Sequence, residues 1–190
     1  MKQQRLIHTF LFCAGIVLLL VGAALAVRAQ RVVGISQHLH RLAGESHDLR
    51  DTTLSYGCIA EENMPDERCT PGDIFPQATA EQICVPGYSR KARNVSVSQK
   101  NRIYASYGIR SHRVGEYNID HLISLQLGGS NEDSNLWPEA ENPRPGYHEK
   151  IKVENFLHGE LCKGEITLRQ AQRLVGQHWR DIHYLLQGIE

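Results

Sequence analysis

The sequence has no net charge, because its 21 Lys and Arg residues balance its 21 Asp and Glu residues. Net charge therefore gives no reason to expect a nucleic-acid partner. The chain also lacks internal repeats and low-complexity segments, which excludes a repeat architecture. Its 190 residues are enough for one domain with a hydrophobic core and too few for two.

Cysteine is scarce, and no two cysteines form a Cys-x-x-Cys pair. This absence disfavours a zinc site, which is kept as the alternative. Cys13 lies in an apolar leader, and the other four cysteines suit two disulfides in an oxidising compartment. Four cysteines allow three pairings, and the pairing we expect joins Cys84 to Cys162 and Cys58 to Cys69.

The N-terminus holds the long hydrophobic run of the sequence. Lys2 and Arg5 precede 18 uncharged residues from Phe10 to Val27. The basic start, the apolar run and the small residues before Gln30 predict that residues 1–29 are a secretory signal. The run is also long enough to span a bilayer, so an anchor formed by residues 10–27 is the alternative. We expect an exported protein, either periplasmic or secreted, or else held in the inner membrane by this segment.

Acidic residues are absent between Tyr88 and Gly115. Without residues 1–29, which hold three basic residues and no acid, the chain has 18 basic and 21 acidic residues. Within this mildly acidic protein the acid-free segment concentrates seven cations: Arg90, Lys91, Arg93, Lys100, Arg102, Arg110 and Arg113. Such a concentration favours contact with a phosphate backbone. A solvated helix face is the alternative interpretation.

Residues 30–57 are polar with weak helical spacing and predict a linker or a loose helix. Residues 58–190 are the expected domain, and they begin with a proline-rich loop, 58–76, that two cysteines staple. Helix starts are indicated by three pairs with capping-box spacing: Thr79 with Gln82, Ser96 with Gln99, and Thr167 with Gln170. The helix after Ser96 is expected to end at Gly108.

A hairpin and a helix are predicted next. Alternating apolar residues from Glu116 to Leu127 indicate a strand. The polar loop GGSNEDSN then leads to a short second strand at Leu136 and Trp137. Gly146 opens a helix that runs to about Leu161. The predicted fold class is α+β, with its core at about residues 116–162.

These elements resemble the ββα-metal core of HNH endonucleases. The resemblance lies in the order of Asp120-His121, Asn135 and His148 on the hairpin and the following helix. Small exported bacterial proteins of this type are more similar still, through the segments DHLISLQLGGSNEDSNLWPE, GYHEK and ENFLH. The segments CTPG, CVPGY and LC extend the resemblance from Cys69 to about Trp179. It implies a ββα-metal fold with additional helices and a disulfide-stapled N-terminal loop.

The resemblance also implies roles for four side chains. His121 is the expected general base, because a neutral imidazole can take a proton from water near pH 7. Asp120 and His148 are the expected ligands of one divalent cation, Mg²⁺ or Mn²⁺, with Zn²⁺ or Ni²⁺ as alternatives. Neighbouring strand residues point to opposite faces, so this site needs a twist or bulge after Asp120. Asn135 is expected to tie the loop to the strand and to orient the His121 ring.

The expected function is metal-dependent hydrolysis of phosphodiester bonds in nucleic acid, with DNA favoured over RNA by the resemblance and with low sequence specificity. The expected phosphate contacts are Arg90, Lys91, Arg93, Lys100, Arg102, Lys150 and Lys152. Two alternatives are a non-catalytic cell-envelope module that binds nucleic acid and a purely structural domain. A membrane is a partner only if the leader is uncleaved, and an inhibitor protein would leave no mark in one chain.

Three features depart from the resembled pattern. Ser124 stands where a proline is common, three residues beyond the histidine. His148 comes thirteen residues after Asn135, farther than in compact members, so Asn142 and Asn155 are alternative ligands. No zinc-knuckle cysteines flank the site, which leaves the disulfides and the last helix to support it.

Overall fold

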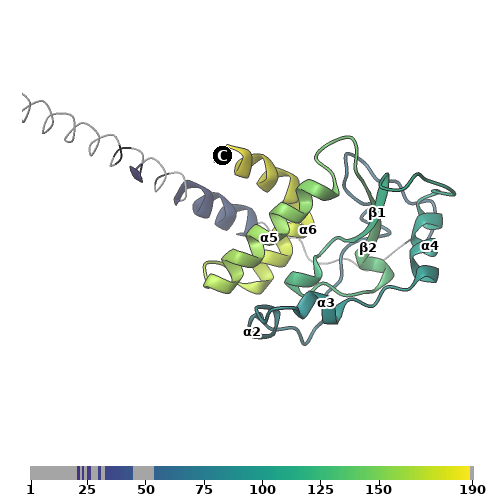
Figure 1. The fold of residues 1–190 in the computed structure, drawn as a ribbon, viewed down its shortest axis with the longest axis horizontal. Helices are drawn as coiled ribbons and strands as arrows, with labels where there is room; N and C mark the ends of the chain where they lie inside the picture. Colours follow the sequence, from purple (N-terminus) through teal and green to yellow (C-terminus); the bar gives the residue numbers. More distant parts are fainter. Residues whose placement is uncertain are drawn as a thin grey trace, which may run out of the picture.

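The computed structural model describes residues 33–44 and 54–188, together with the isolated positions 21, 23, 25, 26 and 30 (Figure 1). The predicted signal, residues 1–29, and the alternative anchor, residues 10–27, therefore lie almost wholly outside the described residues. Among the residues that are described, no helix has the length and apolarity needed to cross a bilayer.

Helices begin where local capping signals predict. α2 (Ala80–Ile83) follows Thr79 and α6 (Leu168–Gln187) follows Thr167, and each start has a complete capping box. α4 (Val97–Ser106) follows Ser96, whose hydroxyl accepts a hydrogen bond from the backbone of Gln99. The Gln99 side chain does not return to this cap and instead contacts the loop near residue 131.

Two further helices complete the domain. α5 (Tyr147–Lys163) starts after Gly146, as predicted, and ends two residues beyond the expected Leu161. α3 (Tyr88–Ala92) is a short helix that the capping signals did not indicate, because its N-cap, Gly87, has no side chain to accept a hydrogen bond. It lies between α2 and α4 and carries part of the basic segment.

β1 (Tyr117–His121) and β2 (Leu136–Ala140) form a two-stranded antiparallel sheet with a regular register. The predicted strand from Glu116 to Leu127 was too long. After His121 the chain leaves the sheet and forms two short 3₁₀ turns, η1 (Leu125–Leu127) and η2 (Asp133–Asn135). Residues 122, 123 and 125 are all buried, so the apolar spacing there reflects a loop enclosed by the core rather than a one-sided strand.

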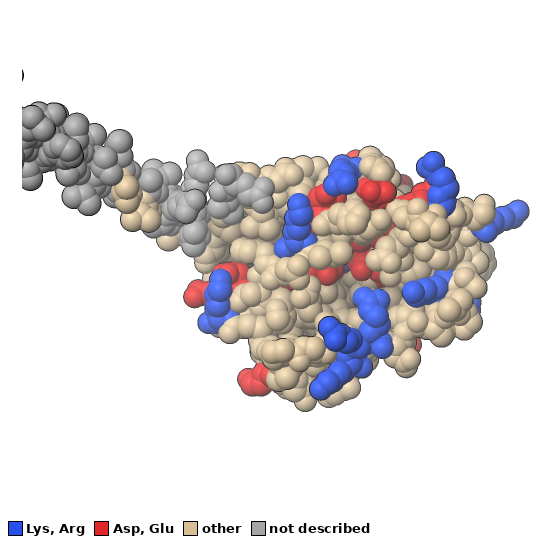
Figure 2. Space-filling model, in the orientation of Figure 1, with Lys and Arg blue, Asp and Glu red and all other residues tan. Residues whose placement is uncertain are grey.

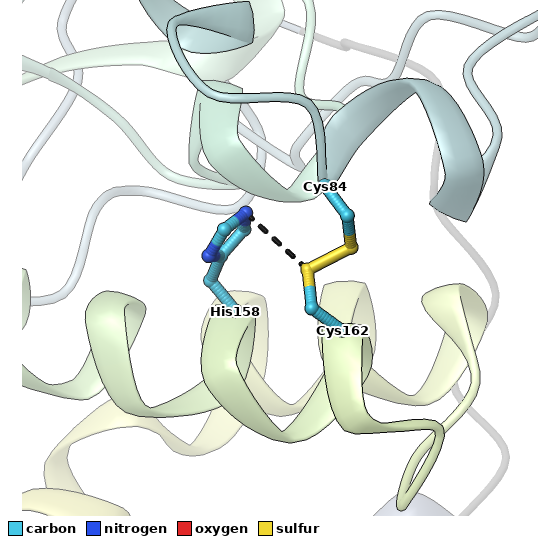
Figure 3. Close-up of side chains that lie close together, drawn as sticks. All are labelled: Cys84, His158 and Cys162. Atoms are coloured by element: carbon cyan, nitrogen blue, oxygen red, sulfur yellow. Dashed lines mark hydrogen bonds between the residues drawn. A yellow bond between two sulfur atoms is a disulfide. The ribbon is translucent and has the colours of Figure 1, made fainter.

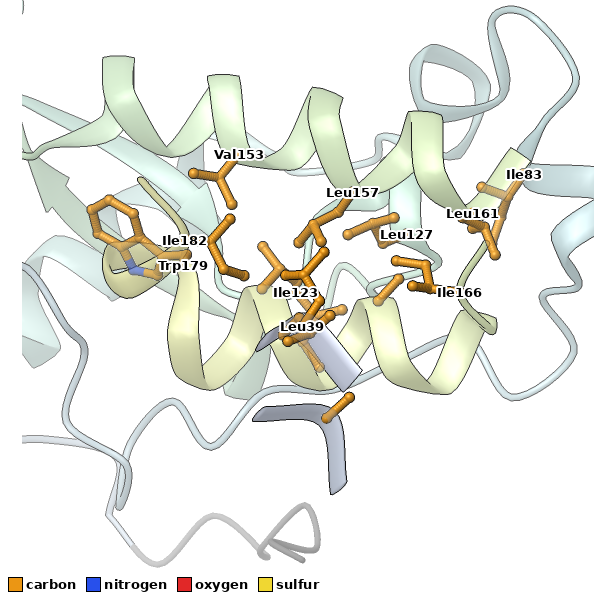
Figure 4. Packing of buried hydrophobic residues seen from close by; sticks show 14 residues of the cluster. Leu39, Ile83, Ile123, Leu127, Val153, Leu157, Leu161, Ile166, Trp179 and Ile182 are labelled. Atoms are coloured by element: carbon orange, nitrogen blue, oxygen red, sulfur yellow. The ribbon is translucent and has the colours of Figure 1, made fainter. Parts of the chain in front are cut away.

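The hydrophobic core lies between α5 and α6, which pack side by side (Figures 1 and 4). Val153 and Leu157 of α5 meet Trp179 and Ile182 of α6, and none of the four is exposed. Full burial of one such side chain stabilises the fold by about 1.5–3 kcal/mol. The segment expected to be a linker or loose helix is helical at residues 33–44, and its Leu39 belongs to the same core.

Both disulfides have the predicted pairing. Cys58 is bonded to Cys69, which closes the proline-rich loop. Cys84 is bonded to Cys162 across 78 positions of sequence, which ties the end of α2 to α5. Two disulfides are typical of proteins that reach an oxidising, exported environment.

Candidate functional site

Asp120 and α5 meet in a buried cluster of charges. The Lys150 ammonium donates to Asp120 Oδ2 at 2.6 Å, to Glu154 Oε1 at 2.5 Å and to the backbone oxygen of His121 at 2.8 Å. Lys150 is 0% exposed. Because an ammonium has three hydrogens, these three contacts satisfy it completely.

A second carboxyl group from the sheet joins the cluster. Glu139 of β2 lies diagonally across the hairpin from Asp120, on the same face. It is fully buried, and within the part of the chain that the structure describes no donor group reaches its carboxyl oxygens. Burial, followed by repulsion from Asp120, raises the pKa of Glu139 well above its usual value. The raised pKa favours the protonated form of Glu139, which can donate a hydrogen bond to Asp120.

The remaining charges of the cluster follow from burial and pairing. Burial opposes the charged form of Lys150, but the neighbouring carboxylates outweigh it and raise the Lys150 pKa. Burial would also raise the pKa of Asp120, but Lys150 reverses that effect and lowers it. For Glu154 burial dominates over Lys150, and its pKa is raised. The stable core of the cluster is therefore an Asp120–Lys150 ion pair.

His121 faces away from this cluster. The strand register is regular through Asp120 and His121, so the expected twist or bulge is absent and the two side chains point to opposite faces. The His121 Nε2 atom lies 3.2 Å from Asn131 Oδ1. Since an amide oxygen only accepts, this contact assigns the proton to Nε2 and leaves a lone pair on Nδ1. Nδ1 is buried and has no hydrogen-bond partner among the described residues.

The environment keeps the His121 imidazole neutral. Burial lowers its pKa to about 4, and the positive charges of Arg93 and Lys150 act in the same direction, against the partial opposition of Asp120 and Asn131. A neutral ring at pH 7 has the protonation state that a general base requires. The His121 side chain is nevertheless enclosed, and the residue is only 2% exposed.

Asn131 connects His121 to the basic segment. Its Oδ1 atom also accepts from the Asn94 backbone at 3.1 Å, and its Nδ2 atom donates to the Ala92 oxygen at 2.8 Å. These contacts hold residues 92–94, which include Arg93, beside the imidazole. Sequence reasoning missed Asn131 because nothing distinguishes it from the other polar residues of the loop.

Asn135 holds the loop, as predicted, but it does not contact the His121 ring. Its Oδ1 atom accepts from the backbone of Ile123 at 2.9 Å and of Asp73 at 3.3 Å. Its Nδ2 atom donates to the oxygens of Ile123 at 3.0 Å and of Ser130 at 2.9 Å. Asn131, rather than Asn135, therefore orients the imidazole.

The glycine pair permits the tight fold of this loop. Gly128 has φ +79°, in the left-handed region. A Cβ atom on Gly129 would lie 1.7 Å from the Ile123 oxygen and 2.9 Å from Asn135 Nδ2. Gly129 thus allows the backbone to approach the segment that follows His121.

His148 does not lie beside Asp120. It precedes Lys150 by two residues, which is about 200° around a helix, and its exposed ring has Glu141 as the nearest acid, at 3.9 Å. Within residues 54–188, no ion pair or hydrogen bond links Asp120 to His148 or to the alternative ligands Asn142 and Asn155. The structure thus pairs Asp120 with Lys150 and not with His148: Lys150 Nζ occupies the position facing Asp120, and this arrangement does not fit a divalent cation.

The position of Lys150 corrects a second expectation. Its burial and its three partners exclude the predicted phosphate contact, whereas Lys152 is exposed. The signal was present in the sequence, because Lys150 precedes Val153 by three residues and Leu157 by seven. This spacing places Lys150 on the buried stripe of α5.

One group of side chains in the described part of the chain has metal-ligand geometry. The donor atoms of Cys84, His158 and Cys162 lie within 4.8 Å of one another. His158 Nε2 is 3.6 Å from Cys162 Sγ, beside the disulfide (Figure 3). Such a cluster could hold a metal ion only as free thiolates, and the two sulfurs are bonded to each other here.

The acid-free segment forms an exposed basic surface. Figure 2 shows Lys and Arg side chains gathered on the face that carries α3. The exposed cations of this segment that were predicted to contact phosphate are Arg90, Lys91, Arg93, Lys100 and Arg102. Arg102 forms a 3.3 Å ion pair with Asp133, so part of its charge is already balanced.

These features define a disulfide-bonded α+β domain with a buried ion pair on one face of its hairpin and an enclosed neutral histidine on the other. No family model, curated protein or solved structure matches the chain.

Proposed function

We propose that the protein is an endonuclease that hydrolyses phosphodiester bonds in nucleic acid, DNA in preference to RNA, with little sequence specificity. The observation that carries the proposal is the neutral His121 imidazole, which lies beside an exposed basic segment. Its Nδ1 lone pair has no partner in residues 33–44 and 54–188. The preference for DNA and the low specificity rest on the resemblance to HNH endonucleases and on the absence of base-reading motifs.

In the proposed reaction His121 Nδ1 takes a proton from a water molecule as that water attacks the phosphorus. The P–O3′ bond breaks, and the leaving oxygen takes a proton from solvent, which gives 5′-phosphate and 3′-hydroxyl ends. Asn131 holds the Nε2–H of the same ring, so Nδ1 stays the basic atom. Arg93 supplies positive charge for the phosphate from the adjoining segment.

The proposal assigns no step to a metal ion. The resemblance implies Mg²⁺ or Mn²⁺, with Zn²⁺ or Ni²⁺ as alternatives, but Asp120 and His148 do not converge. The acid that was expected to hold the cation is paired with Lys150 at 2.6 Å. Whether cutting requires a divalent cation is measured in the same experiment that measures cutting.

A second candidate function is supported by the burial of His121. Because the residue is 2% exposed, a water molecule reaches Nδ1 only if the surrounding residues move. An enclosed histidine is also suited to a structural role, in a cell-envelope module that binds nucleic acid through its basic surface without cutting it. The two candidates share the basic surface and differ in whether His121 reacts.

The test compares three proteins on supercoiled plasmid, with each of the four divalent cations and with a chelator. The proteins are the wild type, His121→Ala and His112→Ala, a control at an exposed histidine of the same domain. We expect loss of His121 to slow cutting at least about 100-fold and to leave retention on DNA unchanged. Retention without cutting by the wild type would favour the binding module, and no retention at low salt would refute both candidates.

The proposed partners and location follow the sequence. The disulfides support export, and we propose a periplasmic or secreted protein, or one anchored in the inner membrane by residues 10–27. Binding of DNA through the basic surface would weaken with salt, because each phosphate contact releases counterions.

A further inference from the structure

The face of the hairpin that carries Asp120 already holds a cation. Lys150 reaches it from α5 and is bound by two carboxylate oxygens and one backbone oxygen, all within 2.8 Å. Hard oxygen donors around a fully buried positive charge are the surroundings that a protein also gives to a divalent ion. Here the charge is part of the chain.

We infer that the Lys150 ammonium takes the place opposite Asp120 where the resemblance expects a divalent cation, so that this cluster does not bind one. The position of the side chain carries this inference. The resemblance expects a helix ligand opposite Asp120, and the α5 residue opposite Asp120 is Lys150, with Glu154 one turn further along. The inference goes beyond the proposed function, which depends on His121 on the other face of the hairpin, and it is tested by metal binding rather than by cutting.

Charge explains why a metal ion and Lys150 exclude each other. A divalent ion bound to Asp120 and Glu154 would lie against the ammonium that these two groups already share, with like charges a few ångströms apart in a buried site. The hydrogen bond to the His121 backbone oxygen fixes the ammonium in this place. Repulsion from the Lys150 ammonium therefore disfavours the binding of a second cation in the wild-type cluster.

Removal of Lys150 should allow the cluster to bind a divalent cation. Without its ammonium, the site retains the carboxyl groups of Asp120, Glu139 and Glu154, with no cation to balance them. Glu139 and Glu154 are buried, and the Asp120 side chain is 13% exposed. Carboxylate oxygens of this kind are the ligands that Mn²⁺ and Mg²⁺ prefer. A site that rejects a divalent ion in the wild type thus becomes one that attracts it.

The experiment measures Mn²⁺ binding to the full chain with both disulfides intact, by the loss of the electron paramagnetic resonance signal of free Mn²⁺. The proteins are the wild type, Asp120→Asn, Lys150→Ala and the matched control Lys152→Ala, an exposed lysine on the same helix. We expect Lys150→Ala to bind one Mn²⁺ at least about 10-fold more tightly than the wild type. Lys152→Ala should behave as the wild type, and Asp120→Asn added to Lys150→Ala should abolish the gain.

Two results would overturn the inference. One is Mn²⁺ binding by the wild type that Asp120→Asn removes; the other is a folded Lys150→Ala chain with no gain in binding. If Lys150→Ala does not fold, the comparison of wild type with Asp120→Asn decides alone, and equal, weak binding by the two supports the inference. A failure of plasmid cutting would refute the proposed function and leave these binding results unaffected.

Discussion

Replacement of Asn135 by alanine should destabilise the protein more than most single substitutions. The side chain is 0% exposed, and it makes four hydrogen bonds to backbone groups at 2.9–3.3 Å. A buried hydrogen bond contributes about 1 kcal/mol net, so the loss of four amounts to about 4 kcal/mol. For a chain of this size that corresponds to a fall of roughly 8–16 °C in Tm.

Urea unfolding followed by tryptophan fluorescence measures this change. Trp137 and Trp179 are both 0% exposed, so their emission reports on the sheet and on the α5–α6 core. Asn118→Ala is the control, because Asn118 is exposed on β1 and should change stability by less than about 0.5 kcal/mol. A loss below about 1 kcal/mol for Asn135→Ala would show that the amide does not hold the loop.

Three further outcomes are expected from the same unfolding assay. Lys150→Met should cost about 3–5 kcal/mol, because it leaves buried carboxylates unpaired, and a cost equal to that of the exposed Lys152→Met would contradict the ion pair. Gly129→Ala should cost more than about 3 kcal/mol, since its Cβ would lie 1.7 Å from a backbone oxygen. Gly159→Ala is the control, because a Cβ added there would meet no other part of the described structure within 4 Å. Equal stability of the two variants would refute the close approach. The fold lowers the pKa of His121 from 6.5 to about 4, so the unfolded chain takes up the proton first as the pH falls. The free energy of unfolding should therefore fall by about 3 kcal/mol between pH 6.5 and about pH 4. His121→Gln should flatten this part of the stability–pH profile, and an unchanged profile would argue against a buried neutral ring.

The sequence predicted the local features of the fold well because their causes are local. The capping residues Thr79, Ser96 and Thr167 act on backbone groups within three positions, and each starts a helix. The Gly128-Gly129 pair likewise allows a tight turn whatever the rest of the fold is. The disulfide pairing was also predicted, although spacing alone does not fix it.

The site was harder to predict because it depends on which way α5 faces. His148 was preferred as a metal ligand for its chemistry, whereas the packing of Val153 and Leu157 turns Lys150 toward Asp120. The first strand was predicted to run too far because the apolar spacing continues to Ile123. That residue is buried by elements that are distant in sequence, and it does not belong to the sheet. Asn131 contacts His121 only because the loop folds back, which no local pattern reveals.

The most direct test of the proposed function is the rate of plasmid nicking by the wild type and by His121→Ala under the same conditions. The account predicts nicking by the wild type, a loss of at least about 100-fold in the variant, and the same DNA retention for both. Equal nicking by the two proteins, or none by a folded wild type with any of the four cations or with chelator, would contradict it.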